Sequence, residues 1–294
     1  MPDRYVWTGP DGTVIDLTDE SAGFSVLANG SNGLRAPRFD IASDRYAGID
    51  GERVQTIQAG ARSLSLGLMV RASSEEEMNA RSRGLVRAMR PRLAGVPTPG
   101  TLTVTRSNGS ARSLSCFVTE GLEGDESTDT AMVGAWWKLI LKLWAPTPWW
   151  QGDARSITFG LSAPTSFFPI TPVVLSSSNI QGSLTVDLSD ADAPSYPVWT
   201  ITGPGSALTL TNVTTGRSIQ ITTPIGDGQT VVMDTRPGMQ SVRDGNGNNL
   251  MGSLASDPAL WPLVEGINQV SALLAGAGPA SAISGVYAPS YSGI

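Results

Sequence analysis

A proline-rich break near the middle of the chain most constrains the fold. Residues 144–153 read Trp-Ala-Pro-Thr-Pro-Trp-Trp-Gln-Gly-Asp. Proline has no backbone N–H to donate to a β-ladder, so strand pairing should stop at Pro146 and Pro148. Three tryptophans crowd the same break, which favours a packed hinge over a loose linker. We therefore expect two domains, residues 1–148 and 149–294, a division that suits a chain of 294 residues.

The charge of the chain argues against direct nucleic-acid binding. Charged residues make up 16% of the sequence, with 20 basic and 26 acidic side chains. Before Trp149 there are 16 basic and 17 acidic residues, which leaves 4 and 9 for the rest, a net charge of −5 without a single lysine. Neutralising phosphates requires a basic patch. A surface this poor in charge must be made of Gly, Ser, Thr and Asn or be covered by other copies, and the second option is physically reasonable because interface cores are depleted in charge.

The amino-acid composition excludes several common kinds of catalytic and metal site. Histidine is absent, which excludes Ser-His-Asp and Cys-His catalysis and imidazole metal sites. Cys116 is the only cysteine, and we expect it to be a buried small thiol within a strand. We predict no catalytic, cofactor-binding or metal-binding residues. The sequence shows no signal peptide and no membrane-spanning apolar run, so we expect a soluble protein made in the cytoplasm, with no membrane insertion.

The first half is predicted to be β-rich with one helix. Asn108-Gly109 separates two alternating runs, 101–105 and 111–118, which indicates a hairpin. Ser73-Ser74-Glu75-Glu76-Glu77 offers a capping box, and an apolar stripe follows, so we expect a helix at about 74–93. The stripe contains Met78, Leu85, Val86, Met89 and Leu93.

Segment 132–144 fits either a strand or a helix, and the tryptophans and following prolines favour a strand. One face of that strand would be apolar, while lysines alternate with large apolar residues on the other. Such a strand is expected where a sheet packs inward and also meets a neighbour. The candidate residues for a subunit interface or hinge are Trp136, Lys138, Lys142, Trp144, Trp149 and Trp150.

The second half is predicted to be a β-sandwich or jelly roll. About ten short alternating runs are separated by turn residues, and no long helix is needed to account for the pattern. Thr214-Thr215-Gly216 and Arg236-Pro237-Gly238 are expected to be hairpin turns.

The order of several short motifs resembles the distal tail protein family of long-tailed, siphovirus-type phages. The family commonly shows a Pro-Trp or Pro-Phe corner after its first domain, an Asn-x-x-Thr-Gly hairpin and a Trp-x-Leu-x-x-Gly-x-Asn ending. The matching positions here are the corner at 145–150, Gly203, the hairpin at 212–216, Asp234 and the ending at 261–268. This resemblance spans nearly the whole chain.

The resemblance implies an N-terminal belt domain that forms a ring, usually a hexamer, and a C-terminal galectin-like β-sandwich. The implied protein sits in the virion at the tail tip. Its partners would be the tail tube protein, the tape-measure protein, the tip hub or tail-associated protein and receptor-binding proteins. DNA would only pass through the lumen.

Two other functions remain open from the residues. Trp149 and Trp150 could stack on sugar rings, as in a carbohydrate-binding module for host attachment. A glycosidase needs two positioned carboxylates, and the sequence selects no pair among its 26 acidic residues.

Overall fold

The structure is a computed structural model that describes residues 3–124, 136–161, 165–166, 174–175, 178–255 and 260–294. The chain divides into two compact units. The first comprises Met1–Gly152 and Tyr291–Ile294, and the second comprises Asp153–Ser290. Strands dominate both units, and α1 (Glu75–Ala88) is the single α-helix among the described residues.

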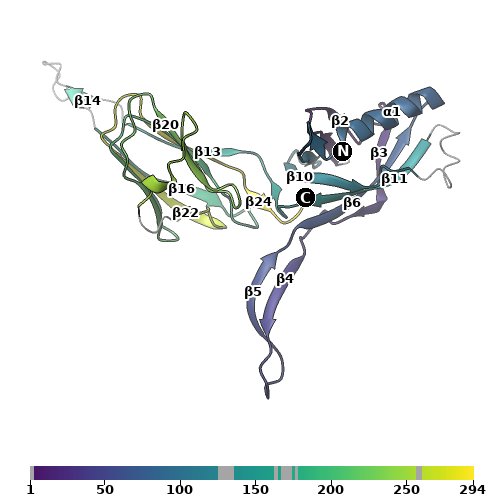
Figure 1. The fold of residues 1–294 in the computed structure, drawn as a ribbon, viewed down its shortest axis with the longest axis horizontal. Coiled ribbons are helices and arrows are strands. Elements are labelled where there is room, and N and C mark those ends of the chain that lie inside the picture. Colours follow the sequence, from purple (N-terminus) through teal and green to yellow (C-terminus); the bar gives the residue numbers. More distant parts are fainter. Residues whose placement is uncertain (1–2, 125–135, 162–164, 167–173, 176–177, 256–259) are drawn as a thin grey trace. The chain divides into compact units, whose positions relative to one another are not determined.

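The first unit is built on a large antiparallel sheet in the order β2-β1-β9-β10-β11-β6-β3, with β12 also paired to β10 and to β24 (Figure 1). The strands of this sheet are β1 (Arg4–Thr8), β2 (Val14–Asp16), β3 (Phe24–Asn32), β6 (Arg62–Arg71), β9 (Gly100–Thr105), β10 (Ala111–Glu120), β11 (Trp136–Ala145), β12 (Trp150–Gln151) and β24 (Ser290–Tyr291). Two separate hairpins complete the unit, β4 (Phe39–Asp44) with β5 (Arg53–Ala59) and β7 (Arg92–Leu93) with β8 (Val96–Pro97).

Both strand predictions for this unit are confirmed. The turn at Asn108-Gly109 joins β9 to β10, with Gly109 at φ 85° and the Asn108 carboxamide oxygen accepting from Ser110 N at 3.0 Å. The segment before the prolines is strand β11, which pairs with β6 over all ten residues. Residues 132–135 of the predicted strand lie outside the described residues.

Helix α1 begins where the sequence predicts and ends earlier. Ser74 is the N-cap, and its hydroxyl accepts from Glu77 N at 3.2 Å. The Glu77 carboxylate accepts in turn from the Ser73 hydroxyl at 2.5 Å and from Ser73 N at 2.7 Å, and these two bonds hold the Glu77 pKa below its usual value. The prediction that the helix continues to about residue 93 is wrong. Because a proline disfavours helical backbone in the residue before it, Pro91 stops the helix at Ala88.

The early helix end also changes the predicted apolar stripe. Met78, Leu85 and Met89 are buried against the sheet, as an apolar helix face should be. Val86 and Leu93 are exposed instead, and Leu93 belongs to the β7–β8 hairpin. Trp7 anchors the other side of this packing, since its indole N–H donates to the carbonyl of Ala88 at 2.9 Å.

The last four residues of the sequence complete the first unit. Three arginines donate to backbone carbonyls there: Arg62 to Ser292, Arg106 to Ile294 and Arg112 to Gly293. The Arg112 guanidinium also lies 3.7 Å from the centroid of the Tyr291 ring. Burial lowers the pKa of Arg62 to about 10, so this side chain remains charged at neutral pH.

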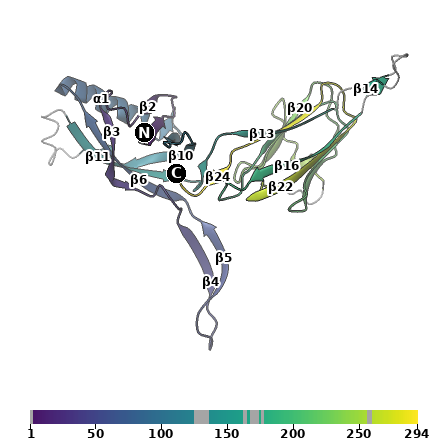
Figure 2. The same ribbon diagram turned by 180° about the vertical axis from the view of Figure 1, so that it is seen from behind.

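The second unit is a sandwich of two antiparallel sheets, as predicted (Figure 2). The first sheet runs β13 (Arg155–Gly160), β23 (Ala282–Tyr287), β17 (Val198–Thr202), β20 (Thr230–Asp234) and β21 (Ser241–Asp244). The second runs β16 (Asn179–Leu188), β22 (Gly266–Ala275), β18 (Ala207–Asn212) and β19 (Arg217–Ile221). A small pair, β14 (Thr165–Ser166) with β15 (Val174–Leu175), and the 3-10 turn η2 (Met251–Ser253) complete the unit.

A buried asparagine pair explains two of the motifs noted in the sequence. Asn212 ends β18 and Asn268 lies in β22, and the Asn212 Nδ2 donates to the Asn268 Oδ1 at 3.1 Å. The same Oδ1 accepts from Val264 N at 2.9 Å, and the Asn268 Nδ2 donates to the Val264 carbonyl at 2.7 Å. The pair therefore fixes the β18–β19 hairpin and the loop after Trp261 to each other. Trp261 itself packs edge-on against Trp199, with ring centroids 5.7 Å apart.

Replacing Asn268 by alanine should destabilise the second unit. The change leaves the buried amide of Asn212 and both backbone groups of Val264 without this partner, which should cost about 2–3 kcal/mol in the free energy of unfolding. Chemical denaturation would measure the loss. The exposed Asn246→Ala is the control and should change stability by less than about 0.5 kcal/mol. Equal effects of the two changes would contradict the assigned role of the pair.

Replacing Tyr291 by alanine should destabilise the first unit while leaving the second unchanged. The change removes a buried ring and its contact with Arg112, with an expected loss of about 2–4 kcal/mol. Hydrogen exchange followed by mass spectrometry should show faster exchange in β10 and unaltered exchange in β22. The half-exposed Tyr46→Ala serves as the control. Faster exchange confined to β22 would refute the placement.

Candidate subunit interface

Strand β11 has two faces with different environments. The residues directed into the core are buried: Trp137, Leu139, Leu141, Leu143 and Ala145. The alternate residues are exposed and define what we call the outward sheet face: Trp136, Lys138, Ile140, Lys142 and Trp144. Since β11 lies between β6 and β10 in the sheet, this exposure is not that of an edge strand. It is the exposure of a sheet face that no other layer of the described chain covers.

The outward sheet face is unusually apolar for a solvated surface. Trp136 is 48% exposed, Ile140 is 52% exposed and Trp144 is 40% exposed. Trp144 is supported from the neighbouring strand β10 by Phe117, at 6.2 Å between ring centroids. Three large apolar side chains in one row mark an interaction surface more often than a free surface.

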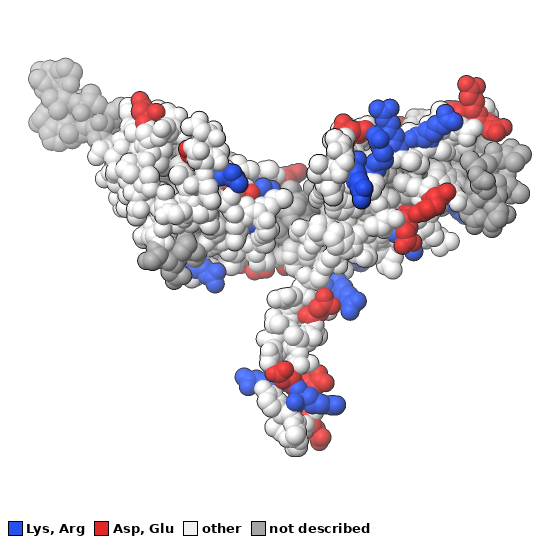
Figure 3. All heavy atoms as spheres, in the orientation of Figure 1, with Lys and Arg blue, Asp and Glu red and all other residues white. Residues whose placement is uncertain are grey.

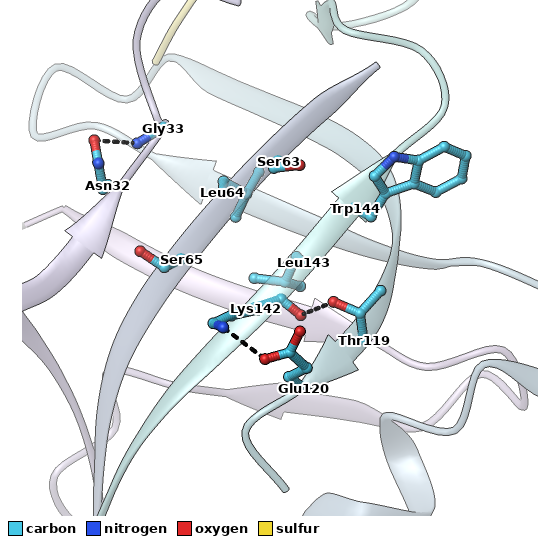
Figure 4. Close-up of a pocket in the computed structure, with 10 residues that line it drawn as sticks. All are labelled: Asn32, Gly33, Ser63, Leu64, Ser65, Thr119, Glu120, Lys142, Leu143 and Trp144. Carbon is cyan, nitrogen blue, oxygen red and sulfur yellow. Dashed lines mark hydrogen bonds and ion pairs between the residues drawn. The ribbon is translucent and has the colours of Figure 1, made fainter.

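A shallow hollow lies at the Trp144 end of this face (Figure 4). Small side chains of β6 form its floor, because Ser63 stands opposite Trp144 and Ser65 stands opposite Lys142. On its other side, the Lys142 ammonium contacts the Glu120 carboxylate at 2.5 Å. The hydrogen bond and charge of Glu120 raise the pKa of Lys142, which therefore stays protonated near neutral pH. The hollow is thus lined by one aromatic ring, small polar groups and an ion pair.

The remaining two candidate residues do not join this face. Trp150 is completely buried in the core of the first unit, with the Arg62 guanidinium 5.9 Å from its ring centroid. Trp149 is half-buried, and its ring lies 6.5 Å from that of Phe39 at the start of β4. The six residues predicted as one set therefore occupy three places in the first unit. Four share the outward sheet face, one lies in the core and one lies beside the β4–β5 hairpin.

Sequence reasoning missed the β4–β5 hairpin. Every residue of β4 is exposed, as are six of the seven residues of β5, and the pair forms a two-stranded sheet of its own. In both views it extends away from the large sheet of the first unit (Figures 1 and 2). The available signal was the alternation of Phe39 and Ile41 with polar residues, followed by Gly48 and Gly51 in the turn region.

Metal-ligating side chains do not cluster in the part of the chain that the structure describes. No cluster of three or more cysteine, aspartate or glutamate side chains is placed to hold a metal ion there. Basic side chains instead collect over helix α1, and the second unit shows few charges (Figure 3). In the described part of the chain, no helix combines the length and apolarity needed to cross a membrane.

Comparison with known proteins assigns the fold. A solved structure of the SPP1 Dit protein, described as a paradigm of the hub adsorption apparatus in phages that infect Gram-positive bacteria, matches with a TM-score of 0.64. The match covers 98% of this chain and 99% of that one at 16% identity. The chain has the Dit fold. This confirms the predicted mainly β architecture and the structural side of the resemblance to distal tail proteins.

Two further matches come from structures of the phage P2 baseplate in its activated conformation. The structure with Ca gives a TM-score of 0.55 at 12% identity, and that with Sr gives 0.54 at 11% identity. Each covers 97% of this chain and 98% of the other. A scan of the sequence against protein-family models finds no match, and a search of the curated proteins finds none either. At these sequence identities the comparisons establish the fold and not the roles of individual surface residues.

The single thiol should be unreactive in the folded chain. Cys116 is buried in β10, as the sequence predicts, and burial raises its pKa to about 12. We expect the native protein to show no fast-reacting thiol toward a thiol reagent at pH 8, because the thiolate is scarce and shielded. In denaturant the same chain should show one. Rapid labelling of the native protein would contradict the placement of Cys116 in the core.

Proposed function

We propose that the chain is a distal tail protein, a structural component of a phage tail tip that self-associates into a ring. In this role the ring joins the tail tube to the tip hub or baseplate. The observation that carries the proposal is the match to the SPP1 Dit fold over 98% of this chain and 99% of that one. The match includes both units and nearly every residue of each chain. A shared architectural role would produce such a match.

The outward sheet face supplies the property that a ring subunit needs. A closed ring requires each subunit to present two different surfaces, one for each neighbour. The row of Trp136, Ile140 and Trp144 is one such surface, since its apolar area is not covered within the chain. Lys138 and Lys142 stand between these apolar residues and would contribute orientation and charge selectivity toward the neighbour.

The charge of the chain suits a channel through which DNA passes without sticking. The net charge is −6, so several copies around a lumen would repel a phosphate backbone. We infer the remaining assignments from the same role. They are a hexameric ring, a place in the virion at the tail tip, contacts with tail tube, tape-measure, hub and receptor-binding proteins, and no enzymatic activity.

No observation favours the carbohydrate-binding alternative for this chain. Sugar stacking requires an accessible aromatic ring, and the ring of Trp150 is completely buried. Trp149 is half-buried, and its ring lies 6.5 Å from that of Phe39, so it belongs to the packing at the base of the β4–β5 hairpin.

Light scattering on the purified full-length chain tests the proposal. The measured mass of the wild-type protein should increase with concentration from that of a single subunit to that of a closed ring. Ile140→Asp should weaken this association by about 100-fold, because it places an unpaired charge in an apolar contact. The matched control is Val213→Asp, which changes an equally exposed valine on the second unit and should associate normally. A wild-type chain that stays single at every concentration would contradict the proposal.

A further inference from the structure

We propose that the β4–β5 hairpin is an arm that docks, through its apolar face, on the outward sheet face of a second copy of the chain. This inference rests on the proposed self-association and names the two surfaces that make it. One surface is the row on β11 described above. The other is formed by the hairpin, whose strands are exposed along nearly their whole length.

The register of the hairpin separates an apolar face from a polar one. Phe39 pairs with Ala59, Ile41 pairs with Ile57, and Ser43 pairs with Val54 after a bulge. Because paired residues of an antiparallel ladder point to the same side, one face carries Phe39, Ile41, Ser43, Val54, Ile57 and Ala59, of which Ser43 is the single polar member. The opposite face carries Asp40, Ala42, Asp44, Arg53, Thr56 and Gln58.

The apolar face needs a cover that the described chain does not provide. Ile41 is 60% exposed and Ile57 is 58% exposed, on a sheet with only two strands. An isolated two-stranded hairpin is at best marginally stable in water and gains stability when another layer packs on its apolar side. The ring of Trp149 is near Phe39 and supports only the base of the arm.

The hairpin is nevertheless held in shape before docking. Near its tip, the Ser43 hydroxyl donates to the Glu52 carboxylate at 2.5 Å, and the Gln55 amide donates to the Asp44 carboxylate. At its base, Gly60 N donates to the Arg38 carbonyl at 3.0 Å. These cross-strand contacts reduce the conformational freedom that docking would otherwise have to remove.

The geometry of the connection favours a neighbour over the arm's own sheet. Only Gly60 and Ala61 lie between the end of β5 and the start of β6. Arg62 follows at once and is fixed by its contacts to the Gly33 and Ser292 carbonyls. In the structure the hairpin does not fold back over the outer side of that strand, and nearly all of its residues are exposed. In the views of the first unit it points away from the sheet (Figure 1).

Charge complements the apolar match. Segment 39–59 contains four acidic residues, Asp40, Asp44, Asp50 and Glu52, and two basic ones, Arg45 and Arg53, so its net charge is −2 (Figure 3). The outward sheet face presents Lys138 and Lys142, with Arg71 opposite Trp136 on the adjacent strand and Glu120 beside Lys142. Glu123 also raises the pKa of Lys142 through its charge, so the three basic groups exceed two acids and leave this surface at +1. A second copy therefore offers both an apolar row and the opposite charge.

The receiving surface also has space for a side chain of the arm. The hollow beside Trp144 is floored by Ser63 and Ser65, so an apolar residue from another chain could enter it against the tryptophan ring (Figure 4). The arm and the hollow are different surfaces of one chain, so the contact is head-to-tail. Contacts of this kind propagate from copy to copy and close into a ring when the rotation allows.

Disulfide trapping between separately made single-cysteine variants tests the contact. Ile41→Cys, on the apolar face of the arm, is mixed with Ile140→Cys on the full-length chain and oxidised under native conditions. The native Cys116 adds little background because it is buried. The matched control replaces Ile41→Cys by Gln58→Cys, on the polar face of the same hairpin. The Ile41–Ile140 pair should form at least about tenfold more heterodimer than the control, because a disulfide requires Cβ atoms within about 4.5 Å.

The outcomes separate this inference from the ring itself. Equal trapping of the two pairs, or none in a sample that light scattering shows to be a ring, would overturn the docking of the arm while leaving self-association intact. Efficient Ile41→Cys homodimers would overturn it too, since they would mean that two arms meet. A ring in which Ile41→Cys stays open to a maleimide probe would likewise overturn the docking of the arm. A chain that never associates and never cross-links would overturn both proposals.

Discussion

The first unit depends on the full-length pairing of β11 with β6. Ten consecutive residue pairs fix the register, so every second residue of β11 is committed to the core and every other one to the outside. Shifting the register by one residue would exchange the two faces and place Lys138 and Lys142 in the core. That cost locks the strand in place. The same register places the apolar row of Trp136, Ile140 and Trp144 on the outside of the sheet. In the proposed assembly, a neighbouring subunit covers this row.

The sheet of the first unit is held both by contacts near the break in the sequence and by contacts between residues far apart in the sequence. Close to the break in the sequence, Trp150 is buried beneath Arg62, and β12 returns the chain to β10. At the end of the sequence, Arg62, Arg106 and Arg112 hold residues 292–294, which are 181 to 230 positions away. The first unit is therefore complete only when the whole second unit has been made. In the proposed ring, each subunit would present its assembly surface on a finished scaffold.

Local patterns made much of this fold predictable. Strict alternation identified β11 and both of its faces, Asn108-Gly109 located a hairpin, and Ser74 with Glu77 located the start of α1. The end of α1 was predicted about five residues late, because the apolar spacing up to Leu93 continued past the point where Pro91 stops helical backbone. The contacts of the arginines with the chain end had no local signal, since neither partner forms a periodic pattern with the other.

The candidate site could be predicted only in part, for a physical reason. Residues that alternate along one strand share a face by geometry, so Trp136, Lys138, Lys142 and Trp144 could be grouped from spacing alone. Trp149 and Trp150 were grouped with them by closeness in sequence, yet a proline corner separates their directions. The β4–β5 arm escaped notice because an exposed hairpin with charged residues between its apolar ones looks, in sequence, like an ordinary loop.

A cryo-EM map of the full-length chain assembled in solution tests the central claim most directly. The account predicts a closed ring around an open lumen, with Trp136, Ile140 and Trp144 of each copy buried against its neighbour. A map of single subunits, or of an assembly whose contacts leave this row of side chains in solvent, would contradict it.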